Sequence, residues 1–110
     1  MATDSVSRRI ELQELLEQIL VKMGLEPNVY YQPPPSVSMS YPAIRYSLNT
    51  IYEKKADDIK YKRNRNYTIT VIDRNPDSII FEKILDLPYS TFLNSYAAQN
   101  LNHWVCDLYF

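Results

Sequence analysis

The segment between Tyr67 and Pro88 constrains the fold more strongly than any other part of the chain. It begins with alternating β-branched and aromatic residues, YTITVID, which favour a strand with one buried face. Asn75, Pro76 and Asp77 follow and are typical of a helix start, because Asn caps unpaired N–H groups and proline needs no N–H partner in the first turn. Four apolar residues at helical spacing then predict an amphipathic helix that ends before Pro88: Ile80, Phe81, Ile84 and Leu85. Because so short a turn forces strand and helix to pack together, the other segments must complete a sheet covered by helices.

An N-terminal helix is predicted from about Asp4 to Met23. Gly24, the only glycine of the chain, is expected to end this helix in the left-handed conformation. The apolar residues of the segment recur at intervals of three and four, so the helix requires a sheet to cover its apolar stripe: Leu12, Leu15, Leu16, Ile19, Leu20 and Met23.

Residues 27–42 contain five of the seven prolines, a composition that favours extended chain over a helix or a central strand. We expect a structured connection of limited flexibility that runs from the helix to the sheet. A proline-rich ligand for an SH3 domain is the alternative.

Three further strands are predicted around the Tyr67 strand. Residues 43–52 alternate, with Ile44, Tyr46 and Leu48 on one face and Arg45, Ser47 and Asn49 on the other. Residues 90–96 form the next strand, and an AAQN turn leads into the last one, residues 101–110. In that last strand one face is apolar and carries Trp104, Cys106, Leu108 and Phe110. The other face carries His103, Val105, Asp107 and Tyr109.

A charged connection, residues 53–66, joins the first two strands. It carries six basic and three acidic residues, a local charge of +3, whereas the rest of the chain has six basic and ten acidic residues and a charge of −4. We expect either a long hairpin excursion or a partly disordered segment. Its basic residues are the candidates for contact with a partner: Lys54, Lys55, Lys60, Lys62, Arg63 and Arg65.

These elements predict a single α+β domain over residues 1–110, with the order helix, strand, strand, helix, strand, strand. The economical arrangement places both helices on one face of a four-stranded, mainly antiparallel sheet with a long charged connection between two strands. The other face, with Thr68 and Thr70, is then exposed unless another subunit covers it. Ten tyrosines are in keeping with such an interface, because tyrosine is enriched there.

Several kinds of chemistry do not fit the sequence. One glycine excludes glycine-rich phosphate loops, so no nucleotide cofactor is expected. His103 and Cys106 lie three residues apart in a strand and point to opposite faces, which is wrong for a shared metal or for a nucleophile with its base. We therefore expect neither a metal site nor an enzyme. Asp73 and Asp77 are either ligands of a cation or, more simply, turn and capping residues.

The remaining alternatives concern surfaces. Residues 60–65, KYKRNR, interleave basic side chains with a tyrosine and are the only candidate for nucleic-acid binding; a solvated loop or a loop that orders on an acidic partner is the other interpretation. The charged N-terminus argues against a secretory signal, and polar residues interrupt the uncharged run 87–106 too often for a membrane span. We expect a soluble protein without a membrane partner.

Three stretches resemble a known family: YPAIRYSL at 41–48, YTITVIDRNPDS at 67–78 and LNHWVCDLYF at 101–110. Through them, residues 41–110 resemble the small tail-terminator or neck proteins of long-tailed bacteriophages. The resemblance implies a virion subunit, assembled in the host cytoplasm, that forms a ring, commonly a hexamer, at the head-proximal end of the tail tube. Such a ring stops tube growth and faces the head connector, and proteins of this kind are often described as minor capsid proteins.

The partners that the resemblance implies are further copies of the chain, the tail tube protein and the head connector or head-closure protein. DNA passing through the ring is the only nucleic acid in this interpretation. Within it, the basic residues of 53–66 are expected to touch a partner, and the turn residues Asp73, Arg74 and Asp77 are candidates for contact between subunits, with support of the fold as their alternative role. A head-closure or connector protein of the same neck is the alternative function.

Overall fold

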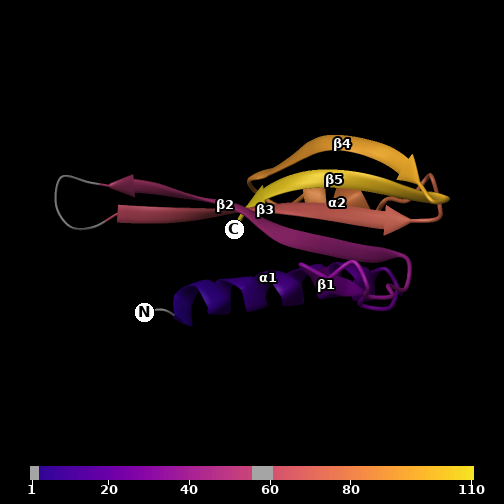
Figure 1. The fold of residues 1–110 in the computed structure, drawn as a ribbon, viewed down its shortest axis with the longest axis horizontal. Helices are drawn as coiled ribbons and strands as arrows, with labels where there is room; N and C mark the ends of the chain where they lie inside the picture. The colour runs from indigo at the N-terminus through magenta and orange to yellow at the C-terminus, as the bar shows by residue number, and fades with distance from the viewer. Residues whose placement is uncertain (1–2, 56–60) are drawn as a thin grey trace.

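The chain forms two helices and five strands over residues 3–55 and 61–110, the part that this computed structural model describes; side chains are described for residues 8–51 and 64–110 (Figure 1). In chain order the elements are α1 (Thr3–Lys22), β1 (Val29–Tyr31), β2 (Ala43–Lys55), β3 (Tyr61–Asp73), α2 (Ile80–Leu85), β4 (Ser90–Ala98) and β5 (Leu101–Tyr109).

The strands form one mixed sheet with the order β1-β2-β3-β5-β4. β1 pairs with β2 in parallel, and the other three pairs are antiparallel. The α+β class, the two helices and the mainly antiparallel pairing are confirmed. The expected number of four strands is wrong, because β1 lies inside the proline-rich connection 27–42 and adds a fifth strand at one edge. Three residues are too few to show an alternating pattern, and pairing with Ile44–Tyr46 defines this strand.

Both helices cover the same face of the sheet. α1 is confirmed close to its expected bounds, and it ends before Gly24, which has a φ of 78° as a left-handed cap requires. The fully buried side chains Leu12, Leu16 and Leu20 follow one stripe of α1. They form one core cluster with side chains of α2 and of the three central strands: Ile44, Tyr46, Tyr67, Ile69, Val71, Ile80, Ile84, Trp104, Cys106 and Leu108.

The start of α2 differs from the prediction. The helix begins at Ile80, and Asn75 and Pro76 lie in a turn before it. The reason is a competing set of hydrogen bonds: Asp73 Oδ1 accepts from the Asn75 N–H at 3.1 Å, and Asn75 Oδ1 accepts from the Asp77 N–H at 2.9 Å. Short polar side chains form such turns as readily as helix caps. The helix ends at Leu85, ahead of Pro88 as expected.

The two C-terminal strands form a tight hairpin. Gln99 and Asn100 have φ values of 54° and 64°, the left-handed conformation that both central residues of a type I′ turn adopt. The expected AAQN turn is therefore confirmed, and the strand before it runs two residues further than predicted, to Ala98. The apolar face of β5 is also confirmed, because Trp104, Cys106 and Leu108 belong to the core.

The hairpin of β2 and β3 extends beyond the rest of the sheet (Figure 1). β3 pairs with β5 only as far as Asn66, opposite Tyr109, whereas β2 and β3 pair with each other as far as Lys55 and Tyr61. We call Thr50–Lys55 and Tyr61–Asn66 the arm. The described parts of 53–66 thus agree with the long hairpin and not with the disordered alternative; residues 56–60 lie outside the described residues. The predicted strand 43–52 is correct but three residues too short.

Candidate interaction surfaces of the arm and the sheet edge

The arm concentrates positive charge. It contains five basic residues and one acidic residue, Glu53. The register places Glu53 opposite Arg63, but it places Lys54 opposite Lys62. Like charges directly opposite one another destabilise a strand pair, so an acidic partner would stabilise the arm. Four predicted contact residues, Lys54, Lys55, Lys62 and Arg63, are therefore brought together on two paired strands, whereas Lys60 lies outside the described residues.

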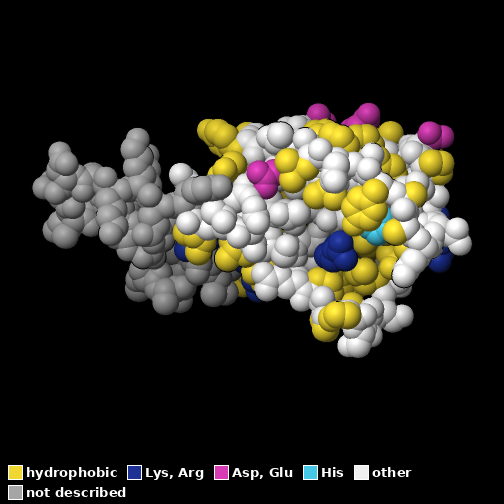
Figure 2. Space-filling view, turned by 45° about the horizontal axis from the view of Figure 1, so that its top comes forward, with side chains coloured by type: hydrophobic (Ala, Val, Ile, Leu, Met, Phe, Trp, Pro, Cys, Tyr) yellow, Lys and Arg dark blue, Asp and Glu magenta, His cyan; other side chains and the backbone are white. Residues whose placement is uncertain are grey.

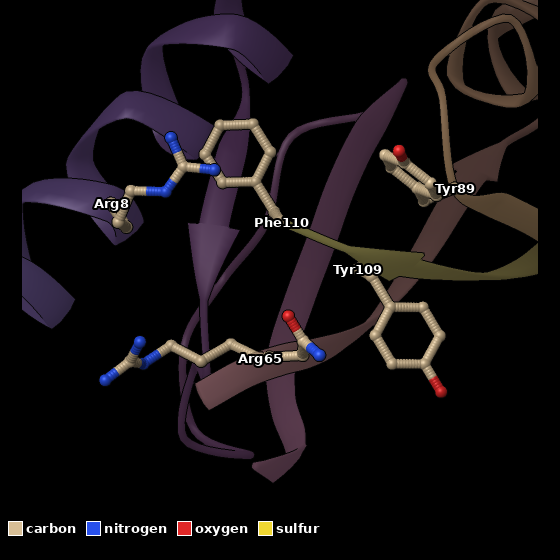
Figure 3. Close-up of a pocket in the computed structure, with 6 residues that line it drawn as sticks. Arg8, Arg65, Tyr89, Tyr109 and Phe110 are labelled. Carbon is tan, nitrogen blue, oxygen red and sulfur yellow. The ribbon is translucent and has the colours of Figure 1, made fainter. Parts of the chain in front are cut away.

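The base of the arm borders a pocket of about 430 Å³ (Figure 3). Arg65, the remaining basic residue of the arm, lines this pocket together with Arg8 of α1, Tyr89 and Phe110. The Arg8 guanidinium lies 4.1 Å from the centroid of the Phe110 ring and also forms an ion pair with Glu11 at 2.9 Å. Figure 3 shows Arg8 beside the Phe110 ring, with Arg65 reaching out from β3. Arg8 is thus engaged within the fold, and Arg65 adds positive charge where the arm joins the body.

The other predicted contact residues lie far from the arm. Asp73, Arg74 and Asp77 follow the opposite end of the thirteen-residue strand β3, roughly 40 Å of extended chain from Tyr61. The structure therefore separates the predicted residues into two groups. Asn102 Nδ2 lies 3.3 Å from the carbonyl oxygens of both Asp73 and Arg74 and donates to them, so the hydrogen bonds of this turn agree with support of the fold. Among the described residues, no group of three or more acidic, His or Cys side chains is arranged to hold a metal ion.

Sequence reasoning missed the outer edge at β4. This strand is the last of the sheet, and eight of its nine residues are exposed. Apolar side chains stand open to solvent along and beside it: Tyr89 is 79% exposed, Leu93 53%, Tyr96 45% and Phe92 43%. Figure 2 turns the upper side of Figure 1, where β4 lies, toward the viewer and shows hydrophobic side chains spread over it. The uncharged run 87–106 was the signal in the sequence.

The face opposite the helices is less open than predicted. Thr70 is buried on it, and Arg45, Ser47 and Thr68 are half-buried. Pro33 from the connection and Arg45 help to line a groove of about 280 Å³ at the β2 end of this face. The face is thus partly covered by the chain's own side chains.

His103 and Cys106 lie on opposite sides of the sheet, as predicted. The His103 ring stacks on Tyr96 with ring centroids 4.5 Å apart and an angle of 8°; the single cyan side chain of Figure 2 is this histidine. Burial lowers the pKa of His103. Cys106 is in the core, and burial raises the pKa of its thiol to about 11. The two side chains therefore do not form a common site.

Asp107 lies on the same face of the sheet as His103 and has a hydrogen-bond acceptor atom that is not used by the described residues. Asp107, which is half-buried, follows the core residue Cys106 in β5 and is paired with Thr91 of β4. Its Oδ1 is buried and has no hydrogen-bond partner among the residues that the structure describes. A buried carboxylate oxygen of this kind is costly unless a donor reaches it, so Asp107 is a candidate acceptor for a basic group from outside the chain.

Comparison of the sequence with protein-family models and with curated proteins finds no match. Among the described residues, neither helix has the length and apolar content needed to cross a membrane.

Proposed function

We propose that this chain is a structural virion protein, a tail terminator that forms a ring at the head-proximal end of a phage tail tube, caps the tube and joins it to the head connector. The observation that carries the proposal is the unprotected edge of β4, which offers unpaired backbone groups and exposed apolar side chains to another chain. A surface of this kind serves assembly, because an added strand satisfies the edge and covers the apolar residues.

The three stretches that resemble tail terminators occupy the middle of the fold. They lie in β2, in β3 with the turn after it, and in β5, which are the three interior strands of the sheet. The resemblance therefore concerns the framework that positions β4 and the arm at its two ends.

A ring needs two different surfaces on each subunit, because head-to-tail contacts generate closed rings whereas a single self-complementary patch generates a two-fold dimer. The chain offers two such surfaces, the basic arm and the uncharged edge of β4. In the proposed assembly the chain binds other copies of itself in a closed ring, expected to be a hexamer, together with the tail tube protein and the head connector. The ring belongs to the virion neck, is assembled in the host cytoplasm and lets DNA pass through its lumen.

The test is the mass and shape of the purified protein. Analytical ultracentrifugation over a range of concentrations, followed by negative-stain electron microscopy with and without the tube protein of the same phage, is expected to show closed rings of this chain. A protein that stays monomeric at every concentration and forms no ring on tubes refutes the proposal. The position of the ring in a density map of the assembled particle separates a tail terminator from a head-closure or connector protein of the same neck.

A second candidate function is nucleic-acid binding by the arm. The observation that favours it is the shape of the arm, since a two-stranded ribbon fits the major groove of DNA and this ribbon carries five basic residues. Binding of a DNA duplex that weakens steeply as salt is raised, and that the double variant Lys62→Glu/Arg63→Glu abolishes, supports this function. Unchanged binding in that variant refutes it.

A further inference from the structure

The two outer edges of the sheet differ in how they are protected. At one edge β1 is three residues long and lies in a proline-rich connection, and short strands and prolines are common devices against unwanted pairing. At the other edge β4 is nine residues long, without a charge or a proline. Its one irregularity is a register shift between Phe92 and Asn94. Of these two outer strands, β4 is therefore the one that is open to an added strand.

The arm, as far as the structure describes it, has an unpaired strand edge that a partner strand would stabilise. A two-stranded ribbon is only marginally stable in water, because neither of its faces is covered by other elements. Beyond Asn66 the arm strands pair with each other, and among the described residues a further backbone hydrogen bond lies at Arg65. Within the part of the chain that the structure describes, the outer edge of β2 is unpaired from Thr50 to Lys55, since β1 pairs no further than Tyr46. At the base of the other arm strand, the Phe110 N–H already donates to the Arg65 carbonyl. The β2 edge is thus the more available one.

The edge of β4 is long enough to take the whole β2 edge of the arm. Six residues of the arm span about 20 Å and the nine residues of β4 about 30 Å, so the whole β2 edge of an arm fits along β4.

Charge decides between the ways in which two copies can meet. The segment 53–66 carries +3 and the rest of the chain −4, so two arms repel each other and two bodies repel each other. An arm against a body is attractive. Near β4, the α2 region carries Glu82 and Asp86 with Lys83, and β5 carries Asp107. Arg45 adds a positive charge close to His103, the residue on which Tyr96 of β4 stacks. Head-to-tail contact between an arm and the β4 edge is therefore the favoured arrangement.

We propose that the arm of one copy lies along the β4 edge of the next copy and adds its β2 strand, Thr50–Lys55, to that sheet. The inference deepens the proposed function and rests on it, because it names the contact by which the ring closes. The added strand covers Phe92, Leu93 and Tyr96.

Cross-linking of two single variants tests this arrangement. Ile51 in the arm is 44% exposed and Leu93 in β4 is 53% exposed, so Ile51→Cys and Leu93→Cys both place a reactive thiol at the surface. The natural Cys106 is fully buried and can stay in place. The two variants are mixed at a concentration at which the unmodified protein forms rings and are treated with a flexible bis-maleimide. Val21→Cys on α1, where Val21 is 47% exposed, replaces either variant in the control mixtures.

The expected result is a cross-linked dimer that forms in the Ile51→Cys and Leu93→Cys mixture and is at least about tenfold scarcer with either variant alone or with the Val21→Cys control. Cross-linking of Leu93→Cys to itself at the same yield means two-fold pairing of β4 edges and overturns the inference. Absence of any cross-link in rings that still form overturns the inference and leaves the proposed function standing. A protein that forms no rings, with or without tube protein, overturns the proposed function as well.

A second pair of variants separates the contact from folding. Leu93→Lys places a charge in the middle of the proposed interface and is expected to weaken self-association at least about tenfold, as loss of a central interface side chain commonly does. Val21→Lys is the matched control and is expected to leave association unchanged. Trp104 fluorescence verifies that both variants are folded. Equal association of Leu93→Lys and Val21→Lys overturns the inference.

Discussion

Truncation of Leu16 gives the most direct test of how the helix and the sheet hold together. Leu16 lies in the middle of the buried stripe of α1 and is fully buried in the single core cluster. Leu16→Ala removes about three buried methyl or methylene groups, worth roughly 0.8 kcal/mol each, and the cavity that remains adds to this loss. We expect the free energy of unfolding to fall by about 3 to 4 kcal/mol.

That loss is large for a chain of this size. A domain of 110 residues commonly has a stability of about 5 to 15 kcal/mol, so Leu16→Ala should remove a substantial part of it and leave the protein folded at room temperature. Val21→Ala on the same helix is the control, because Val21 is 47% exposed and its truncation should change stability by no more than about 0.5 kcal/mol.

Urea unfolding followed by fluorescence measures both variants. The single tryptophan, Trp104, is buried in the same core, and its ring stacks on Phe81 with centroids 5.3 Å apart. Its emission therefore reports the opening of the core that α1 covers. If Leu16→Ala shifts the midpoint no more than Val21→Ala does, α1 does not pack on the sheet as described, and the reasoning from buried area fails.

Three further predictions concern single side chains. The pKa of the Cys106 thiol is raised from 9.0 to about 11, so between these pH values the folded chain keeps a proton that the unfolded chain releases. The contribution of Cys106 to the free energy of unfolding is therefore fully present below pH 9 and falls by on the order of 2 kcal/mol as the pH rises to 11. Urea midpoints measured between pH 9 and 11 should show this loss of stability in the unmodified protein. The loss should be smaller in Cys106→Ala, where the raised pKa values of the buried tyrosines Tyr46 and Tyr67 remain. Because the pKa of His103 is lowered in the folded chain, its contribution to stability is present above about pH 6.5 and is lost as the pH falls below that value. Urea midpoints that stay constant in this acid range, or that change equally in His103→Gln, contradict this prediction. Tyr46→Phe removes the hydroxyl that donates to Gln13 Oε1, and we expect a loss of about 1 to 3 kcal/mol in the same urea assay; a loss no larger than that of Val21→Ala refutes a stabilising role for this bond.

The regular elements could be predicted from residue periodicity. The stripe of α1 and the alternation in β2, β3 and β5 are local patterns, and burial of these faces confirms them except at Leu48. Leu48 is 36% exposed and lies where a register shift interrupts the pairing of β2 with β3. The short strand β1 has no pattern of its own, because its conformation depends on pairing with residues fifteen positions away in the sequence. The start of α2 was misjudged because Asn75 suits two local structures, and Asp73 ahead of it favours the turn.

The candidate surfaces were predictable only in part. Basic composition identified the arm, but its length as a ribbon was not visible because both of its strands are polar and show no alternation of apolar residues. The importance of β4 depends on the strand order, in which β5 lies between β3 and β4 and leaves β4 outermost. The order of strands results from contacts across the whole sheet and cannot be read from the residues of β4 alone.

The unbroken course of β3 has a mechanical consequence. The same strand forms half of the arm and then passes through the centre of the sheet, held by β2 on one side and β5 on the other. A force along the axis of the arm therefore loads the hydrogen bonds of β3 to β2 and of β3 to β5 together, in shear. These bonds are not broken one after another from one end. In the proposed ring, tension on an arm would therefore reach the centre of the subunit's sheet through β3.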